Sequence, residues 1–294
     1  MPPLEEGTVA ILSIGQMGLG IAKLLITHKY HVITNVRDRS AATKARALSA
    51  GIQLYDTDED IVRDADYVLS IVPPRDAVAT AKRVCAAWTD SEKHSRVFEP
   101  PEYNVQFIDG GIIGGPPIPP SEQHGGRWTK PGIPLSGPVS LENAGVLGAH
   151  LAEALNTKHI GPEIGTASGL KCCFAAISKG FTALALQSFS TASSLGVLEP
   201  LKEYMDLYNP NARQKAEKNI VGCTGKAYRW VEEMNQIGEC FSTAGSWQDQ
   251  ACVFREIAGV FQGLADVVEE KGGEGMKDDE GVVEALGKKL RSKS

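Results

Sequence analysis

The stretch Thr8–Gly18, TVAILSIGQMG, decides how the rest of this 294-residue chain is interpreted. Its first half is a continuous apolar run typical of a buried strand, and its second half carries two glycines where a helix begins. A turn of this kind directs helix N–H groups at a pyrophosphate. Gly15 allows the ligand to approach and Gly18 allows the helix to pack on the strand, although the strict fingerprint has glycine where this chain has Ser13. The stretch predicts a dinucleotide site, with a structural tight turn as the alternative. The expected cofactor contacts are Gly15, Gln16, Met17 and Gly18.

Downstream of this turn, short strand-like runs alternate with helical patterns as far as about residue 162, which is typical of βαβ units and a parallel sheet. Strands are expected over 8–13, 31–36, 52–55, 66–72 and 105–109, and helices over 16–28, 41–50 and 76–87. The apolar runs Val9–Leu12 and Tyr67–Val72 predict strands buried on both faces. Between Gly110 and Pro138, the density of Gly and Pro predicts loops and short strands that shape a cleft.

A different pattern begins after residue 163. The stretch 167–195 has no proline and is rich in Ala, Leu, Phe and Ser, which predicts a single helix about 40 Å long. Further helices are expected over 201–207, 212–221, 228–241 and 248–270, followed by a polar, Gly-rich tail. Within the third of these, Trp230, Met234, Ile237 and Phe241 recur at helical spacing, which favours core packing over a substrate pocket.

The predicted fold is therefore an α/β N-terminal Rossmann domain with a mostly parallel sheet, residues 1–163, followed by an all-α C-terminal domain built on one long helix, residues 164–294. A helix of this length exceeds what a small domain needs. We expect it to form the interface of a homodimer, with a buried spine as the alternative.

The end of the second strand indicates which dinucleotide is bound. NAD sites usually place a carboxylate there, about 20 residues after the glycine turn, to accept the ribose hydroxyls. This chain has Asn35 at that place, followed by Arg37, Arg39 and Ser40. Because guanidinium groups match phosphate oxygens, we expect NADP(H) rather than NAD(H). The alternative is that the two arginines belong to a solvated turn.

The end of the fourth strand, Ile71, Val72 and Pro73, is expected to line the nicotinamide side of the cofactor. Ligands of open α/β sheets bind beyond the carboxyl ends of the strands, which is where this segment lies. The alternative is that Pro73 only ends the strand, because proline has no N–H to donate to a neighbour.

Composition excludes several other classes. The net charge of −6 and the absence of a long basic cluster argue against a nucleic-acid partner. The longest apolar stretches are interrupted well before the roughly 20 residues of a bilayer span, and the N-terminus lacks a basic n-region, so we expect neither a membrane segment nor a secretory signal. The six cysteines show no CxxC spacing, which predicts reduced, mostly buried thiols in the cytoplasm and no metal site.

Four motifs, in this order and spacing, resemble the β-hydroxyacid dehydrogenases related to 6-phosphogluconate dehydrogenase, and most closely the branch with a C-terminal domain of unknown function. They are the turn with Gly15, Met17 and Gly18, the segment 70–74, the segment 109–115 (DGGIIGG) and Gly169-Leu170-Lys171 at the start of the long helix. The resemblance spans nearly the whole chain. It implies an NADP-dependent oxidoreductase that acts on a small-molecule substrate.

The resemblance also implies roles for individual residues. Lys171 matches the lysine that exchanges a proton with the reacting oxygen in the family, and the loop 109–115 matches the loop that contacts the substrate carboxylate. The expected substrate contacts are Asp109, Gly110, Gly111, Ile113 and Gly114. Helical spacing places Ser178 on the face of Lys171, where its hydroxyl is expected to orient substrate or water. The alternative is that Lys171 is an ordinary surface lysine.

Two departures from the family bear on the substrate. The family usually has Ser at the position of Ile113 and Asn at that of Ala175, so polar substrate contacts are lost and a larger or more apolar substrate is favoured. Ser178 stands where 6-phosphogluconate dehydrogenase has an acidic residue, which excludes that activity. We expect hydride transfer between NADPH and a carbonyl or hydroxyl substrate in an interdomain cleft. The alternatives are imine reduction and a catalytically silent NADP sensor or scaffold.

Overall fold

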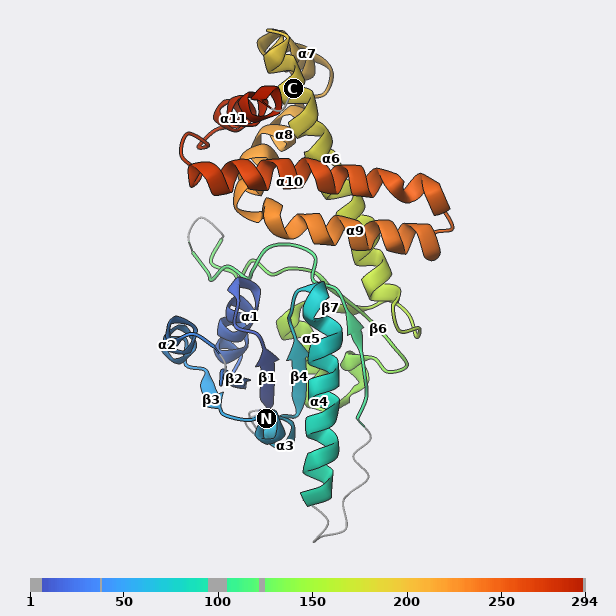
Figure 1. Ribbon diagram of the computed structural model, residues 1–294. Helices are drawn as coiled ribbons and strands as arrows, with labels where there is room; N and C mark the ends of the chain where they lie inside the picture. The colour runs from blue at the N-terminus through green and yellow to red at the C-terminus, as the bar shows by residue number, and fades with distance from the viewer. Residues whose placement is uncertain (1–6, 38, 95–104, 122–124, 293–294) are drawn as a thin grey trace. The chain divides into compact units, whose positions relative to one another are not determined.

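The computed structural model describes residues 7–37, 39–94, 105–121 and 125–292 (Figure 1). It divides into two compact units, Met1–Lys171 and Cys172–Ser294. The division falls inside the long helix, whereas the sequence pattern placed the boundary before it, between residues 163 and 164. The first turns of that helix therefore belong to the first unit, and they bring Lys171 into it.

Four parallel strands form the main sheet of the first unit, in the order β3-β2-β1-β4. The elements in chain order are β1 (Thr8–Leu12), α1 (Gln16–Thr27), β2 (His31–Asn35), α2 (Ala41–Ser49), β3 (Gln53–Tyr55), α3 (Asp58–Asp64), β4 (Tyr67–Ser70) and α4 (Pro74–His94). The sheet confirms the predicted Rossmann-type α/β fold. The short helix α3 is an addition, because the sequence analysis expected no helix between β3 and β4.

Helices cover both faces of this sheet, as the alternation of side chains along β1 shows. Val9 and Ile11 belong to a core cluster with α1 and the later helix α5 (Gly145–Leu155), whereas Ala10 and Leu12 pack with Ile61 of α3 and with α4. Successive side chains of a strand point to opposite faces, so one apolar run serves two layers. The predicted burial of β1 on both faces is confirmed.

The same prediction is wrong for β4. Among the described strands, β4 pairs with β1 alone and lies at the edge of the main sheet, and Val68 is 37% exposed. An apolar run alone does not distinguish an edge strand from a central one, because strand order depends on contacts distant in sequence.

The Gly- and Pro-rich segment contributes a second, small sheet with the order β5-β6-β7. Its strands are β5 (Asp109–Gly110), β6 (Ile133–Ser136) and β7 (Thr157–His159). β5 is antiparallel to β6, and β6 is parallel to β7. Of the predicted strand 105–109, only Asp109 is paired as a strand residue, while the segment 110–138 has the expected loops and short strands.

Helices make up the described part of the second unit. They are α6 (Thr166–Ser194), which begins in the first unit, α7 (Leu198–Tyr208), α8 (Pro210–Cys223), α9 (Ala227–Thr243), α10 (Val253–Lys271) and α11 (Asp279–Ser292). The predicted core stripe of α9 is confirmed, since Met234 and Ile237 are buried and Phe241 packs against Phe254 at 4.6 Å between ring centroids. Trp230 likewise meets Phe261 edge to face at 5.1 Å.

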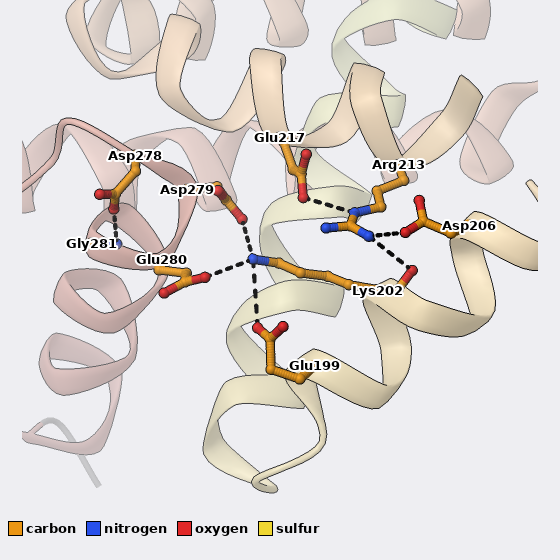
Figure 2. Close-up of polar contacts among 9 residues, drawn as sticks. All are labelled: Glu199, Lys202, Asp206, Arg213, Glu217, Asp278, Asp279, Glu280 and Gly281. Carbon is orange, nitrogen blue, oxygen red and sulfur yellow. Dashed lines mark hydrogen bonds and ion pairs between the residues drawn. The ribbon is translucent and has the colours of Figure 1, made fainter. Parts of the chain in front are cut away.

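The predicted polar tail is wrong beyond residue 278, because α11 follows the glycines. Its residues Val282, Val283 and Leu286 are buried in the core of the second unit. Figure 2 shows how Lys202 of α7 holds the start of this helix. Lys202 Nζ lies 2.9 Å from Glu280 Oε1 and 3.1 Å from Asp279 Oδ2, so a nearly buried ammonium joins two helices that are far apart in sequence.

Two further expectations change with the structure. By length and composition, α6 is apolar enough to cross a bilayer, contrary to the expectation from interrupted apolar runs, although core helices of soluble proteins satisfy the same criterion.

Of the six free cysteines, only Cys223 is buried, while Cys85, Cys173 and Cys252 are exposed, so the prediction of mostly buried thiols is wrong. Burial raises the pKa of the Cys223 thiol to about 12.

Candidate functional site

The turn between β1 and α1 has the shape that the sequence motif requires. Ser13, which stands where the strict fingerprint has glycine, adopts a positive φ of 107°. A Cβ on Gly18 would lie 2.0 Å from the carbonyl oxygen of Ser13, so only glycine permits α1 to start this close to the strand. A Cβ on Gly15 would meet nothing within 4 Å, which leaves space in front of the turn.

The N-terminus of α1 fits a dinucleotide phosphate. Gly15 is its N-cap residue and supplies no side-chain acceptor, and no acidic residue lies in the first turn. Gln16 is exposed and Met17 is half-buried at the start of the helix. The first backbone N–H groups of a helix need an acceptor, and a phosphate at this end would provide one.

A cavity of about 510 Å³ lies beside this turn within the first unit. Its lining comes from four places: Ser13 of the turn, Arg39 of the segment after β2, the β4–α4 connection, and α4. The lining residues are Ser13, Arg39, Val72, Pro73, Arg75, Asp76, Ala79, Thr80 and Arg83. Three regions that the sequence analysis assigned to the cofactor therefore meet at one place.

The other residues expected around the ribose mainly shape the backbone. Asn35 Nδ2 donates to Asp58 Oδ1 at 2.8 Å, and Asn35 Oδ1 accepts from the backbone N–H of Arg37 at 3.0 Å. Ser40 is the N-cap of α2, where its Oγ accepts from the backbone N–H of Thr43. Arg37 is exposed and does not line the cavity, and Ile71 packs against a core cluster.

Sequence reasoning missed two arginines of the cavity, Arg75 and Arg83. The Nε of Arg83 lies 2.5 Å from Asp58 Oδ2, and the Asp58 side chain is only 8% exposed. Arg75 Nε lies 3.7 Å from Asp76 Oδ2 at an exposed position. A signal was present, because offsets of three, four and seven place Asp76, Ala79, Thr80 and Arg83 on one face of α4.

Asp109, expected at the substrate, holds the start of α6. Its Oδ2 accepts hydrogen bonds from the backbone N–H groups of Ser168 at 2.9 Å and Gly165 at 3.1 Å, and from Ser136 Oγ at 3.2 Å. Its Oδ1 accepts from Ser168 Oγ at 2.6 Å. A carboxylate at this position satisfies unpaired N–H groups and complements the helix dipole. The Asp109 carboxylate is thus occupied by hydrogen bonds to groups of the protein itself, at the start of α6.

Lys171 and the glycine loop are in direct contact. A Cβ on Gly111 would lie 3.0 Å from the Cβ of Lys171 and 3.2 Å from the carbonyl oxygen of Ala167, so the missing side chain lets α6 approach the loop. Lys171 is exposed. Ser178, seven residues later, donates to the carbonyl oxygen of Ala175 in its own helix at 3.4 Å.

The rest of the loop 109–115 is arranged by backbone pairing. Ile113 exchanges two hydrogen bonds of 2.9 Å with Gly132, Gly110 lies against Leu135, and Gly114 has a φ of 120°. Within the described residues, no group of three or more His, Cys, Asp or Glu side chains is placed to hold a metal ion.

Comparison with known families divides the chain in a similar way. Residues 8–96 match the family described as NADP oxidoreductase, coenzyme F420-dependent. Residues 192–264 match a domain of unknown function, DUF1932. The two matches confirm the resemblance predicted from the motifs. The chain thus matches an NADP-oxidoreductase family in its first part and a domain of unknown function in its second part.

Similar proteins support the same fold. A curated 28.5 kDa protein of Methanothermus fervidus, uncharacterised, is 27% identical over 66% of this chain and 76% of its own length. A conserved hypothetical protein of Sinorhizobium meliloti 1021 has a TM-score of 0.62 at 20% identity and covers 98% of both chains. A conserved protein of unknown function, described as structurally similar to 3-hydroxyacid dehydrogenases, has a TM-score of 0.59 at 22% identity over 88% of this chain and 97% of that one.

A third solved structure is an imine reductase variant from Myxococcus stipitatus in complex with NAD⁺. It has a TM-score of 0.51 at 18% identity and covers 96% of this chain and 99% of its own. These likenesses establish that the fold is that of the 3-hydroxyacid dehydrogenases.

Proposed function

We propose that this protein is an NADP(H)-dependent oxidoreductase that interconverts a carbonyl compound and an alcohol, with Lys171 as the proton donor and acceptor. The observation that carries the proposal is the contact between Lys171 and Gly111, because it brings the lysine of α6 against the loop 109–115. The phosphate-compatible turn at Gly15 and the arginine-lined cavity support NADP(H) as the cofactor.

The residues of the chain have separate tasks in this proposal. When bound at the turn around Gly15, NADPH would supply the hydride that reduces the carbonyl carbon. Lys171 transfers a proton from its Nζ to the carbonyl oxygen, which completes the alcohol, and it recovers a proton from solvent. The loop beyond Gly111 offers the substrate backbone and apolar groups, because residues 112–115 are two isoleucines and two glycines. The Asp109 carboxylate before it is hydrogen-bonded to α6. We propose that Asp109 acts on the substrate only through the position of this helix.

The decisive experiment is the substitution Lys171→Ala. With ketones and aldehydes we expect turnover to fall by about 10²-fold or more, the usual scale of general acid catalysis. NADPH affinity, measured by fluorescence titration, should change less than twofold. Lys158→Ala is the matched control, since Lys158 is an exposed lysine of β7 in the same unit. Unchanged turnover in Lys171→Ala on every accepted substrate would overturn the assignment.

Imine reduction is the second candidate, and it is favoured by Ile113 and Ala175, which replace polar contacts, and by the similar fold of an imine reductase. A protonated iminium carries its own proton, so Lys171→Ala should impair its reduction much less than carbonyl reduction. Screening cyclic imines beside ketones separates the two reactions. If the wild-type protein binds NADPH but reduces neither class, the sensor or scaffold alternative replaces both.

A further inference from the structure

The cavity beside Ser13 brings three guanidinium groups together, of which the sequence pattern indicated one. Arg39 comes from the turn after β2, whereas Arg75 and Arg83 come from α4. Asp76 is the carboxylate among the lining residues, and Asp58 pairs with Arg83, so three guanidinium groups stand against two carboxylates. The lining therefore suits an anionic part of a ligand.

Arg83 is the arginine whose orientation the fold fixes most firmly. Its Nε is held at 2.5 Å by the Oδ2 of Asp58, whose side chain is 8% exposed, while the Arg83 side chain itself is 51% exposed. Asp58 is in turn fixed by the hydrogen bond from Asn35 Nδ2 to its Oδ1. Since Asp58 engages Nε, its contact leaves the two terminal nitrogens of the guanidinium to meet a ligand oxygen.

The same contacts change the chemistry at the end of β2. In NAD sites a carboxylate at this place accepts the ribose hydroxyls. Here Asn35 occupies the place, and the carboxylate that it contacts, Asp58, already receives Arg83. A ligand that enters the cavity at this side meets a guanidinium instead of a free carboxylate.

We propose that Arg83 is a specificity-determining residue that binds the 2′-phosphate of NADP(H), and that Asp58 is the positioning residue that orients it. Arg39 and Arg75 complete the phosphate-binding wall. The inference rests on the proposed function only in the identity of the cofactor, and it assigns the preference for NADP(H) to a residue of α4.

The test is a fluorescence titration of the full chain with NADPH, NADH and adenosine 2′,5′-bisphosphate, the last as a competitor that carries the phosphate without the nicotinamide. In Arg83→Gln the Kd for NADPH and for the bisphosphate should rise about tenfold or more, as expected for the loss of charge-assisted hydrogen bonds. The Kd for NADH should change less than twofold. Asp58→Asn should show the same selectivity with a smaller loss.

Two further variants keep the test decisive. Arg75→Gln removes an exposed arginine of the same wall and should weaken the binding of NADPH but not that of NADH. This variant can be measured even if Arg83→Gln folds poorly because Asp58 is left unpaired. Arg63→Gln is the control, because Arg63 is an exposed arginine of α3 paired with Asp60 and Asp64 and does not line the cavity. It should bind both cofactors as the wild type does.

The outcomes separate this inference from the proposed function. If the wild type prefers NADPH but Arg83→Gln keeps that preference, the role of Arg83 is refuted and the proposed function stands. Equal weakening of NADPH and NADH in Arg83→Gln also refutes it, because the contact would then involve a part common to both cofactors. If the wild type binds neither cofactor, or binds both equally, the proposed cofactor itself is wrong.

Discussion

Ser13 combines an unfavourable backbone with a position at the edge of the cofactor cavity. Its φ of 107° lies in a region that L residues rarely adopt, and it is held there between β1 and the close approach of Gly18. Such a residue typically costs about 1–3 kcal/mol and persists when the surrounding structure enforces it. The turn keeps its shape through its neighbours rather than through the preference of Ser13.

Replacing Ser13 with glycine should therefore stabilise the protein. We expect the free energy of unfolding of Ser13→Gly to rise by about 1 kcal/mol, because relief of strain exceeds the roughly 0.5–1 kcal/mol of extra unfolded-chain entropy. Denaturant unfolding measures the change. Ser188→Gly in the middle of α6 is the control and should lower stability by about 0.5 kcal/mol. A lower stability of Ser13→Gly would show that this φ carries no strain.

Individual residues were predictable where their environment is local in sequence. The spacing of Gly15 and Gly18 indicated the turn, and the structure brings Arg39, Val72 and Pro73 to one cavity as their positions at strand ends suggested. The spacing on α4 offered a signal for Arg83, but its pairing with Asp58 could not be predicted because Asp58 lies on another helix. The capping role of Asp109 also depends on a distant partner, since Ser168 lies 59 residues further along the chain.

Elements of the second unit are tied together by the charged cluster around Lys202. Its side chain is 5% exposed, and its ammonium contacts Glu280, Asp279 and, at 3.8 Å, Glu199 (Figure 2). Burial alone would lower the pKa of Lys202, but the hydrogen bonds to Glu280 and Asp279 outweigh it and raise the pKa above its ordinary value of 10.5. The cluster therefore favours the folded state while Lys202 is charged.

Lys202→Met should lower the free energy of unfolding at neutral pH by about 2 kcal/mol. This is less than the 3–5 kcal/mol of a fully buried pair, because Glu280 and Glu199 are exposed. The group has a raised pKa in the folded state, so its contribution is complete below pH 10.5 and is lost as the pH rises through the folded-state pKa. The difference between wild type and variant should thus be constant from pH 7 to about 9 and shrink above pH 10.5.

Denaturant unfolding across this pH range checks the result. Lys288→Met is the control, because Lys288 pairs with Glu284 at an exposed i,i+4 position and should matter by less than about 0.5 kcal/mol. A Lys202→Met protein as stable as the wild type at pH 7 would contradict the assigned role.

Long periodic helices were predicted well from the sequence, whereas the short helix α3 and the helix α11 near the C-terminus were not. The helix predicted at 167–195 is α6, with bounds that differ by one residue at each end. α3 has seven residues, too few for a period to show. The glycines at 272–275 suggested a tail, although the spacing of Val282, Val283 and Leu286 after them is helical.

For the molecule as a whole, the apolar residues on α6 bear on assembly. Phe174 is 52%, Ile177 75% and Leu184 63% exposed. Their offsets of three and seven place them on one face of the helix, and exposed apolar faces of this kind favour association. We propose that α6 forms the interface of a homodimer.

The cytoplasmic location stays a prediction.

We expect static light scattering at micromolar concentration to give twice the chain mass of 31.4 kDa. The double substitution of Ile177 and Leu184 with glutamate should give monomers, because two charges would lose solvent on association. Leu48→Glu on α2, also 60% exposed, is the control and should leave the mass unchanged. A monomeric wild type would refute the dimer.

The exposed positions of Cys85, Cys173 and Cys252 affect how such a mass is interpreted. In air-oxidised solution, any of these sulfurs can join two chains covalently where no interface exists, since exposed thiolates form disulfides readily. A cross-linked pair would have the mass of a dimer and would also survive the glutamate substitutions. A species of twice the chain mass therefore counts as an α6 dimer only if it persists in dithiothreitol.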